Sequence, residues 1–254
     1  MSGVTPLAPA PPVPVSPVRS RWWREALLIA TVYVMYDGVR ILVTTGRGEA
    51  FTNAHRVLAL ERALRFAHEQ TINHAVSGHP VFGIMLSYAY ATLHYLITPI
   101  VLVWLWKRRP GRYRGARTAL VSATLLGLLG FWLFPTAPPR MLPGFVDTLV
   151  EYHRWGWWGG AASAPEGLAG LTNEFAAMPS LHVGWAAWCG WQIARNTPQR
   201  WLRTLGVTYP IFIFTVVVGT ANHYIADAVA GVAVIGAGAA LARLTRTSRG
   251  YASL

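Results

Sequence analysis

The stretch TLGVTYPIFIFTVVVGTANHYIADAVAGVAVIGAGAALA, residues 204–242, contains two long apolar segments joined by a short polar turn. Each segment has about the 20 residues that a helix needs to cross a bilayer. The turn places His223 at the start of the second segment and Asp227 one helical turn later. Ionisable groups are costly inside a membrane, so their presence at this point indicates a functional site.

The rest of the chain has the same character. Of its 254 residues 53% are hydrophobic and only 13% are charged, which is unlike an ordinary soluble protein. The apolar runs predict six membrane spans at residues 25–44, 80–106, 117–135, 179–195, 204–222 and 223–242. We therefore expect an all-α integral membrane fold with six transmembrane helices.

The domain organisation follows from composition. Residues 1–20 are rich in proline and alanine and are predicted to be a disordered cytoplasmic tail. Residues 21–247 are expected to form a single six-helix membrane domain, and residues 248–254 a short tail.

The net charge of +12 would suggest a nucleic-acid partner in a soluble protein. Here most Arg and Lys residues precede the first span, separate the second from the third and the fourth from the fifth, or follow the sixth. In a six-span chain all four regions fall on one side, which the positive-inside rule places in the cytoplasm together with both termini. We expect no nucleic-acid partner, and a multi-pass protein of the cell membrane with an extracytoplasmic polar site.

Residues 49–79 are predicted to form an extracytoplasmic amphipathic helix in the membrane interface, because their apolar residues recur at helical spacing. This helix could be a structural strut or one wall of a lipid headgroup pocket. In the long loop that follows residue 135, Trp155, Trp157 and Trp158 are interpreted as interfacial anchors.

Two histidines lie at the starts of predicted helices. Pro179 is expected at the first helical position, which puts Ser180 and His182 in the first turn. Asn222 is expected to cap the other helix and so to place His223 at its start. A helix start presents free N–H groups and a positive dipole end, which favour an anion such as phosphate.

Asp227 is four residues after His223, the spacing at which two side chains share a helical face. A carboxylate that fixes the tautomer of a histidine makes the other ring nitrogen a better nucleophile or base. The second histidine, His182, could then act as an acid toward a leaving group. The sequence therefore predicts a catalytic set of His223, Asp227 and His182.

Histidine and aspartate also serve as metal ligands and as proton relays. As zinc ligands His182, His223 and Asp227 would be a sparse set, so we expect neither a metal nor another cofactor. A membrane transporter with a His/Asp proton relay is the alternative function. Relay residues would be expected near the membrane midplane on interrupted spans, whereas these lie at span ends.

Three motifs resemble a known family. They are FPTAPPR at residues 134–140, MPSLH at 178–182 and HYIAD at 223–227. Together they resemble the membrane-bound type 2 phosphatidic acid phosphatase superfamily, and are most similar to the branch that includes fungal inositol phosphorylceramide synthase. The resemblance covers residues 36–231 and implies a six-helix membrane fold, no metal, and phosphoryl transfer through a phosphohistidine.

The resemblance also implies roles for single residues. His223 would be the nucleophile, Asp227 its orienting carboxylate, His182 the acid that protonates the leaving oxygen, and Ser180 a phosphate ligand. The expected activity is that of a lipid phosphatase, or of an inositolphosphotransferase-like enzyme, on a membrane lipid phosphate at the outer leaflet. The lipid, the acceptor (water or an alcohol) and the oligomeric state stay open.

Two positions depart from the broader phosphatase pattern. Leu181 stands where that pattern has glycine, and Val217 stands where it has an arginine six residues before the nucleophile. A phosphoryl group in transfer needs cationic partners, so the phosphate clamp must come from other residues. Arg140 is the first candidate because it opens the long outer loop, and Arg40 and Arg62 are second candidates.

Overall fold

The computed structural model describes residues 21–42, 47–158 and 174–251. All the regular elements within these ranges are helical, apart from one isolated bridge between Thr136 and Ala176. In chain order they are α1 (Trp22–Leu42), α2 (Arg47–Ala63), α3 (Glu69–Ser77), α4 (Pro80–Arg108), α5 (Pro110–Leu133), η1 (Pro139–Met141), α6 (Thr148–Glu151), η2 (His153–Trp155), α7 (Leu181–Asn196), α8 (Arg200–Gly219) and α9 (Ile225–Tyr251). The predicted all-α fold is confirmed.

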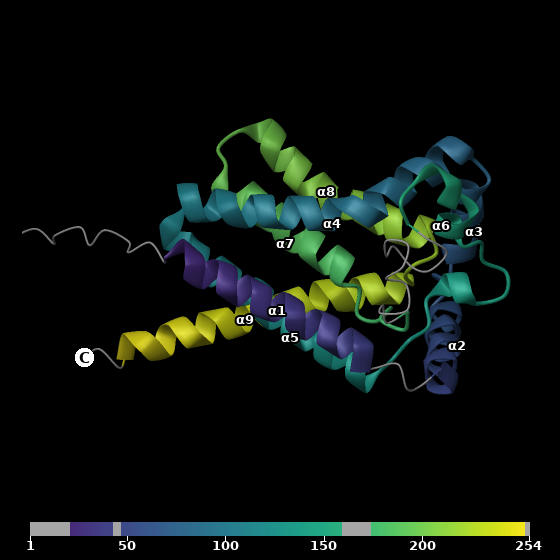
Figure 1. Ribbon diagram of the computed structural model, residues 1–254, viewed down its shortest axis with the longest axis horizontal. Helices are drawn as coiled ribbons and strands as arrows, with labels where there is room; N and C mark the ends of the chain where they lie inside the picture. The colour runs from purple at the N-terminus through teal and green to yellow at the C-terminus, as the bar shows by residue number, and fades with distance from the viewer. Residues whose placement is uncertain (1–20, 43–46, 159–173, 252–254) are drawn as a thin grey trace, which may run out of the picture.

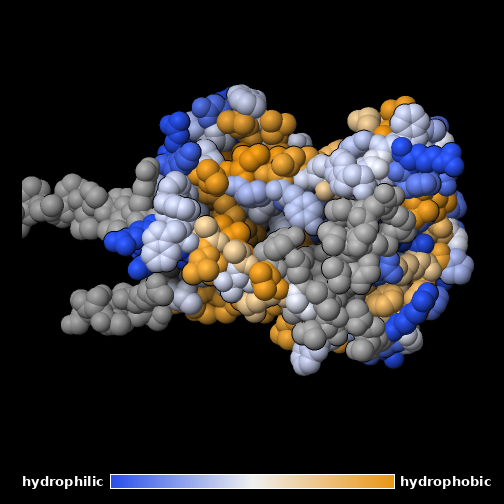
Figure 2. Space-filling model, in the orientation of Figure 1, coloured by the Kyte–Doolittle hydropathy of each residue, from blue (hydrophilic) through white to orange (hydrophobic). Residues whose placement is uncertain are grey.

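The six predicted spans correspond to α1, α4, α5, α7, α8 and α9. Within the described residues, four of these helices are long and apolar enough to cross a membrane, namely α4, α5, α8 and the Ile225–Thr245 part of α9. α7 has 16 residues, fewer than the roughly 20 that a complete span needs. Figure 2 shows hydrophobic side chains gathered over the middle of the molecule and hydrophilic ones at its two ends. A membrane protein is supported, and six complete spans remain an expectation.

The ends of the long helices lie at two opposite ends of the molecule (Figure 1). At one end lie the start of α1, the α4–α5 and α7–α8 connections and the far end of α9. At the other end α2, α3 and α6 surround the starts of α7 and α9. The basic connections therefore gather at one end, as the charge pattern predicts, and their cytoplasmic location stays a prediction. We call the end with α2 and α3 the outer end.

The predicted amphipathic segment is two helices rather than one. α2 ends at Ala63 and α3 begins at Glu69, and between them Arg65 has a φ of 60°, a left-handed conformation that interrupts a helix. The prediction of a single helix over 49–79 is therefore wrong. Part of its apolar stripe is nevertheless buried, including Ala54, Val57 and Leu58, whereas Leu64 is exposed.

Close helix contacts set the position of the two histidines. α7 packs closely on α8 and α9. A Cβ atom added at Gly231 of α9 would lie only 2.1 Å from the carbonyl oxygen of Ser180, the residue before α7. The Ser180 N–H in turn donates to the Asp227 carbonyl oxygen at 2.9 Å. The start of α7 is thus held directly against the first turns of α9.

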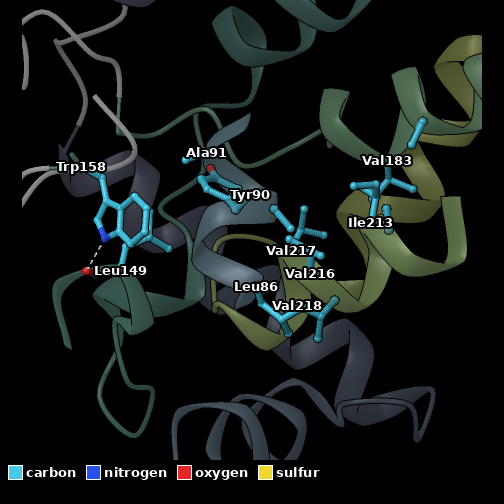
Figure 3. Packing of buried hydrophobic residues seen from close by; sticks show 13 residues of the cluster. Leu86, Tyr90, Ala91, Leu149, Trp158, Val183, Ile213, Val216, Val217 and Val218 are labelled. Carbon is cyan, nitrogen blue, oxygen red and sulfur yellow. Dashed lines mark hydrogen bonds between the residues drawn. The ribbon is translucent and has the colours of Figure 1, made fainter. Parts of the chain in front are cut away.

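The core between α4, α7 and α8 is apolar. Val216, Val217 and Val218 are fully buried and pack in one cluster with Leu86 of α4 (Figure 3). The same cluster contains Trp158, whose ring N–H donates to the Leu149 carbonyl oxygen at 2.9 Å. Trp158 is 1% exposed, so its interpretation as an interfacial anchor is wrong.

Candidate active site

His182 is the second residue of α7. The helix begins at Leu181, and Ser180 is its N-cap, with a buried hydroxyl that accepts from the Val183 N–H at 3.4 Å. Pro179 therefore precedes the cap, and its predicted place at the first helical position is wrong. The consequence for the site is small, because His182 still lies in the first turn of α7.

His223 lies in the turn between α8 and α9. The Val217 carbonyl oxygen accepts hydrogen bonds from the N–H groups of both Asn222 and His223, at 2.9 and 3.2 Å. The predicted Asn222 cap is wrong, because its side chain turns back to Thr220 and also accepts a hydrogen bond from Arg140 at 2.6 Å. The first N–H groups of α9 are bound by carboxylates instead.

The two histidine rings face each other. His223 Nε2 is 3.3 Å from His182 Nδ1, and the ring centroids are 5.4 Å apart. On the other side of its ring, His223 Nδ1 is 2.8 Å from the carbonyl oxygen of Ala177. A carbonyl oxygen can only accept, so Nδ1 carries the hydrogen and the neutral ring has its lone pair on Nε2, toward His182.

Asp227 completes this arrangement. Its Oδ2 is 3.4 Å from His223 Nδ1 and also accepts a hydrogen bond from the Tyr224 N–H at 3.0 Å. Its side chain is 0% exposed. The structure thus brings together the three side chains that the sequence predicted as a catalytic set. The nearer partner of His223 Nδ1, the Ala177 carbonyl oxygen, was not predicted because a backbone contact leaves no mark in the sequence.

α4 contributes two side chains that sequence reasoning missed. The Tyr90 ring stacks on the His182 ring at a centroid distance of 4.6 Å, and the His94 ring meets it edge-on at 4.4 Å. Neither is among the predicted site residues. An ionisable residue in the middle of an apolar segment was the signal that could have identified His94, and the structure shows that it is buried.

Two glutamates at the outer end were also missed. Glu69 Oε1 accepts a hydrogen bond from the Ile225 N–H at 3.1 Å, and Glu61 Oε1 accepts one from the Ala226 N–H at 2.7 Å. Burial, followed by the neighbouring Glu69 carboxyl group, raises the pKa of Glu61 to about 8. These glutamates attach α2 and α3 to the start of α9.

The predicted phosphate-binding residues differ in their distance from the histidines. Arg140 reaches Asn222, the neighbour of His223, and also pairs with Asp147 through Nε at 3.3 Å. Arg62 is exposed on α2. The Arg40 side chain lies outside the part of the structure that is described. Of the basic candidates whose side chains the structure describes, Arg140 is the one placed beside the turn that carries His223.

Leu181 and Val217, the two residues that differ from the phosphatase pattern, are packed in the core. Leu181 is buried against α5, where a Cβ atom added at Gly127 would lie 2.6 Å from a Leu181 methyl carbon. Val217 is buried in the valine cluster of α8 (Figure 3). Both side chains therefore contribute to the packing of the core.

Across the described residues there is no group of three or more His, Cys, Asp or Glu side chains placed to hold a metal ion. The chemistry open to His182, His223 and Asp227 themselves is nucleophilic attack, proton transfer and charge stabilisation.

Comparison with known families decides the broader class. The sequence model described as the PAP2 superfamily matches residues 55–241, most of the chain. The chain belongs to the PAP2 superfamily. The resemblance to type 2 phosphatidic acid phosphatases is thereby confirmed at the level of the superfamily. No curated protein and no solved structure matches the chain.

Membership in the PAP2 superfamily supports a phosphatase- or phosphotransferase-type enzyme that acts on phosphate substrates. The matched residues include His182, His223 and Asp227, together with both missed glutamates. They exclude Arg40, which lies before the match begins.

Proposed function

We propose that this PAP2 protein is a membrane-embedded phosphatase or phosphotransferase that acts on a lipid phosphate at the extracytoplasmic face, through a phosphohistidine on His223. The observation that carries the proposal is the polarity of the His223 ring. Nδ1 is held as a donor by Ala177 and Asp227, so the lone pair of Nε2 is directed at His182, 3.3 Å away.

In the first step, His223 Nε2 attacks phosphorus and forms a P–N bond. The bond between phosphorus and the leaving oxygen breaks, and His182 donates a proton to that oxygen. Asp227 stabilises the positive charge that develops on the His223 ring. An in-line attack needs the phosphoryl group between the nucleophile and the proton donor, so substrate binding must separate the two rings.

In the second step, an acceptor hydroxyl attacks phosphorus and the P–N bond breaks. His182 takes the proton of that hydroxyl, which restores both histidines. Water as acceptor gives a phosphatase, and a lipid alcohol gives a phosphotransferase. The resemblance to the inositol phosphorylceramide synthase branch favours testing the second acceptor directly.

A lipid substrate is supported by a cavity beside the histidines. This cavity of about 280 Å³ lies between α1, α4, α5 and α7, with His94 and Trp185 at its wall and mostly apolar side chains around it. His94 contacts His182, so the cavity begins next to the proposed acid. The lining is mostly apolar, with Thr98, Thr124 and Arg117 as further polar members, and a mostly apolar cavity suits the apolar tail of a lipid.

Arg140 is the proposed source of positive charge for the phosphate. Its side chain is 5% exposed and reaches Asn222, directly before His223. Asp147 pairs with the same guanidinium, and burial raises the pKa of Asp147 while Arg140 opposes that rise. A guanidinium in this place can stabilise the spreading charge of a transferring phosphoryl group.

The test is an assay of purified protein in vesicles that contain phosphatidic acid or a polyprenyl phosphate, with and without EDTA. Release of free phosphate and transfer of the headgroup to an added lipid alcohol are measured separately. We expect wild-type turnover in EDTA and a loss of at least about 1,000-fold in His223→Ala, because the nucleophile is gone.

His55→Ala is the matched control, because His55 is an exposed histidine on α2. Its turnover should stay near the wild-type value. Wild-type turnover in His223→Ala, or complete loss of wild-type activity in EDTA, would contradict the mechanism. Proton-coupled transport without turnover of any lipid phosphate would favour the transporter.

A further inference from the structure

Three carboxylates meet three consecutive N–H groups at the start of α9. Asp227 accepts from Tyr224 at 3.0 Å, Glu69 from Ile225 at 3.1 Å and Glu61 from Ala226 at 2.7 Å. These donors belong to the three residues that follow His223. The backbone that carries the proposed nucleophile is therefore fixed from α2, α3 and α9 at once.

The three carboxylates are buried and accept from consecutive N–H groups, which disfavours ionisation of all three. Their exposed fractions are 0% for Glu61, 1% for Glu69 and 0% for Asp227. The positive end of a helix dipole, equivalent to about half a unit charge, can offset only part of three negative charges. Carboxylates that share a buried site respond by holding a proton on one member.

Glu61 is the member that holds the proton. Its Oε1 accepts from Ala226 next to the contact of Glu69 with Ile225, and its Oε2 is buried without a hydrogen-bond partner, so Oε2 is the atom free to carry a proton. Both Glu69 and Asp227 act on Glu61 as like charges. The other titratable groups facing this cluster are His223, whose Nδ1 is 3.4 Å from Asp227 Oδ2, and Tyr224, whose hydroxyl donates to the Ala137 carbonyl oxygen at 2.9 Å. On α2 itself the neighbouring Arg62 is exposed. A protonated Glu61 can donate to the Glu69 carboxylate, which turns a repulsive pair into a bonded one.

We propose that Glu61 and Glu69 form a carboxylic acid–carboxylate pair that positions His223, and that loss of the shared proton inactivates the enzyme at alkaline pH. The proposal rests on the function proposed above, since it assigns the pair to the same site. Neither glutamate is given a part in the phosphoryl transfer itself. Both act through the first turn of α9.

The direction of the pH effect follows from the raised pKa. Folded Glu61 titrates at about 8, against 4.5 for an ordinary glutamate. Between these values the folded protein binds more protons than the unfolded chain, so stability falls as the pH rises. The stabilising contribution is complete below about pH 4.5 and is lost as the pH passes through 8.

Glu61→Gln is the decisive variant. Its amide oxygen can still accept from the Ala226 N–H, and its NH₂ group can still donate to Glu69, but it cannot ionise. We expect wild-type kcat to fall about tenfold from pH 7 to pH 9, as a single group of pKa about 8 loses its proton. Glu61→Gln should keep near wild-type kcat at pH 7 and lose that alkaline fall.

Two further variants separate positioning from general damage. Glu61→Ala removes the hydrogen bond with Ala226 and the proposed one with Glu69, and we expect kcat to fall at least about tenfold at every pH, so that the glutamine acts as the conservative rescue. Glu49→Gln changes an exposed glutamate of the same helix and should keep the wild-type pH profile. Glu69→Gln removes the other charge of the pair and should flatten the alkaline limb as Glu61→Gln does.

A second readout does not depend on catalysis. The melting temperature of the wild type in detergent should fall between pH 6 and pH 9, and that of Glu61→Gln should change less. An unchanged alkaline limb and an unchanged melting profile in both glutamine variants would overturn the proposal. If the melting profiles flatten but no lipid phosphate is turned over, the carboxyl pair stands and the proposed function fails.

Discussion

At the two ends of the helix bundle, side chains of opposite charge bind the free backbone groups of helix termini. At the outer end, buried carboxylates accept from the first N–H groups of α9. At the other end, Arg109 donates to the Asn196 carbonyl oxygen at the end of α7, through Nε at 3.2 Å and Nη2 at 2.9 Å. Both arrangements satisfy free backbone groups and oppose the helix dipole.

The difference between the two ends lies in burial. The carboxylates of Glu61, Glu69 and Asp227 are at most 1% exposed, whereas Arg109 is exposed. An exposed charge is screened by water and salt and contributes little, but a buried one must be bonded or protonated. The outer end therefore keeps costly charges beside the two histidines, while the arginine end carries charges that suit a membrane boundary.

The largest effect is expected from Asp227→Asn, which removes one buried charge. Asparagine still offers an oxygen to the Tyr224 N–H, so the start of α9 should keep its fold. It no longer stabilises a positive His223 ring, and we expect kcat to fall by about 10²–10⁴-fold. Kinetics on vesicles check this, with Glu151→Gln as an exposed control at the same end. A kcat within about threefold of wild type would show that Asp227 has no electrostatic role.

A smaller effect is expected from Gly231→Ala. The added Cβ would lie 2.1 Å from the Ser180 carbonyl oxygen, so α7 must move relative to α9. We expect a loss of about 1–3 kcal/mol in stability and about tenfold in kcat, because the distance between the two histidines changes.

Gly236→Ala is the control for this variant, since nothing lies within 4 Å of a Cβ atom at Gly236. It should leave kcat unchanged and keep or raise the melting temperature. Equal activity and stability in the two alanine variants would refute the idea that the contact between α7 and α9 sets the site.

The smallest effect is expected from Arg109→Ala at the arginine end. The variant loses two hydrogen bonds that an exposed guanidinium donates to the carbonyl oxygen of the buried Asn196, so stability should fall by about 1 kcal/mol. kcat should stay within about twofold of wild type. A tenfold loss of kcat would mean that the two ends are coupled and that exposed charges at the arginine end affect the site as buried ones do.

Much of this arrangement was predictable from local patterns. Apolar length located the long helices, and the motifs around His182 and His223 identified two residues that the fold brings within 3.3 Å. The missed contacts are those between distant segments. Glu61 and Ala226 are 165 residues apart, and no local pattern states that they meet.

One signal for Glu61 was present in the sequence. It continues the buried stripe of Ala54, Val57 and Leu58 at helical spacing, so it is a carboxylate on the face that should be apolar. The wrong assignments have a similar origin. Asn222 and Trp158 follow general preferences for caps and interfaces, which the tertiary contacts with Arg140 and Leu149 override.

The central claim is tested most directly by trapping the covalent intermediate. Wild-type protein is mixed with a lipid that carries ³²P in its phosphate, quenched within the first turnover, and analysed for protein-bound label. We predict a label that is lost in acid, is stable in alkali and maps to His223, and that is absent in His223→Ala. Turnover without any bound label in the wild type, or label that persists in His223→Ala, would contradict the account.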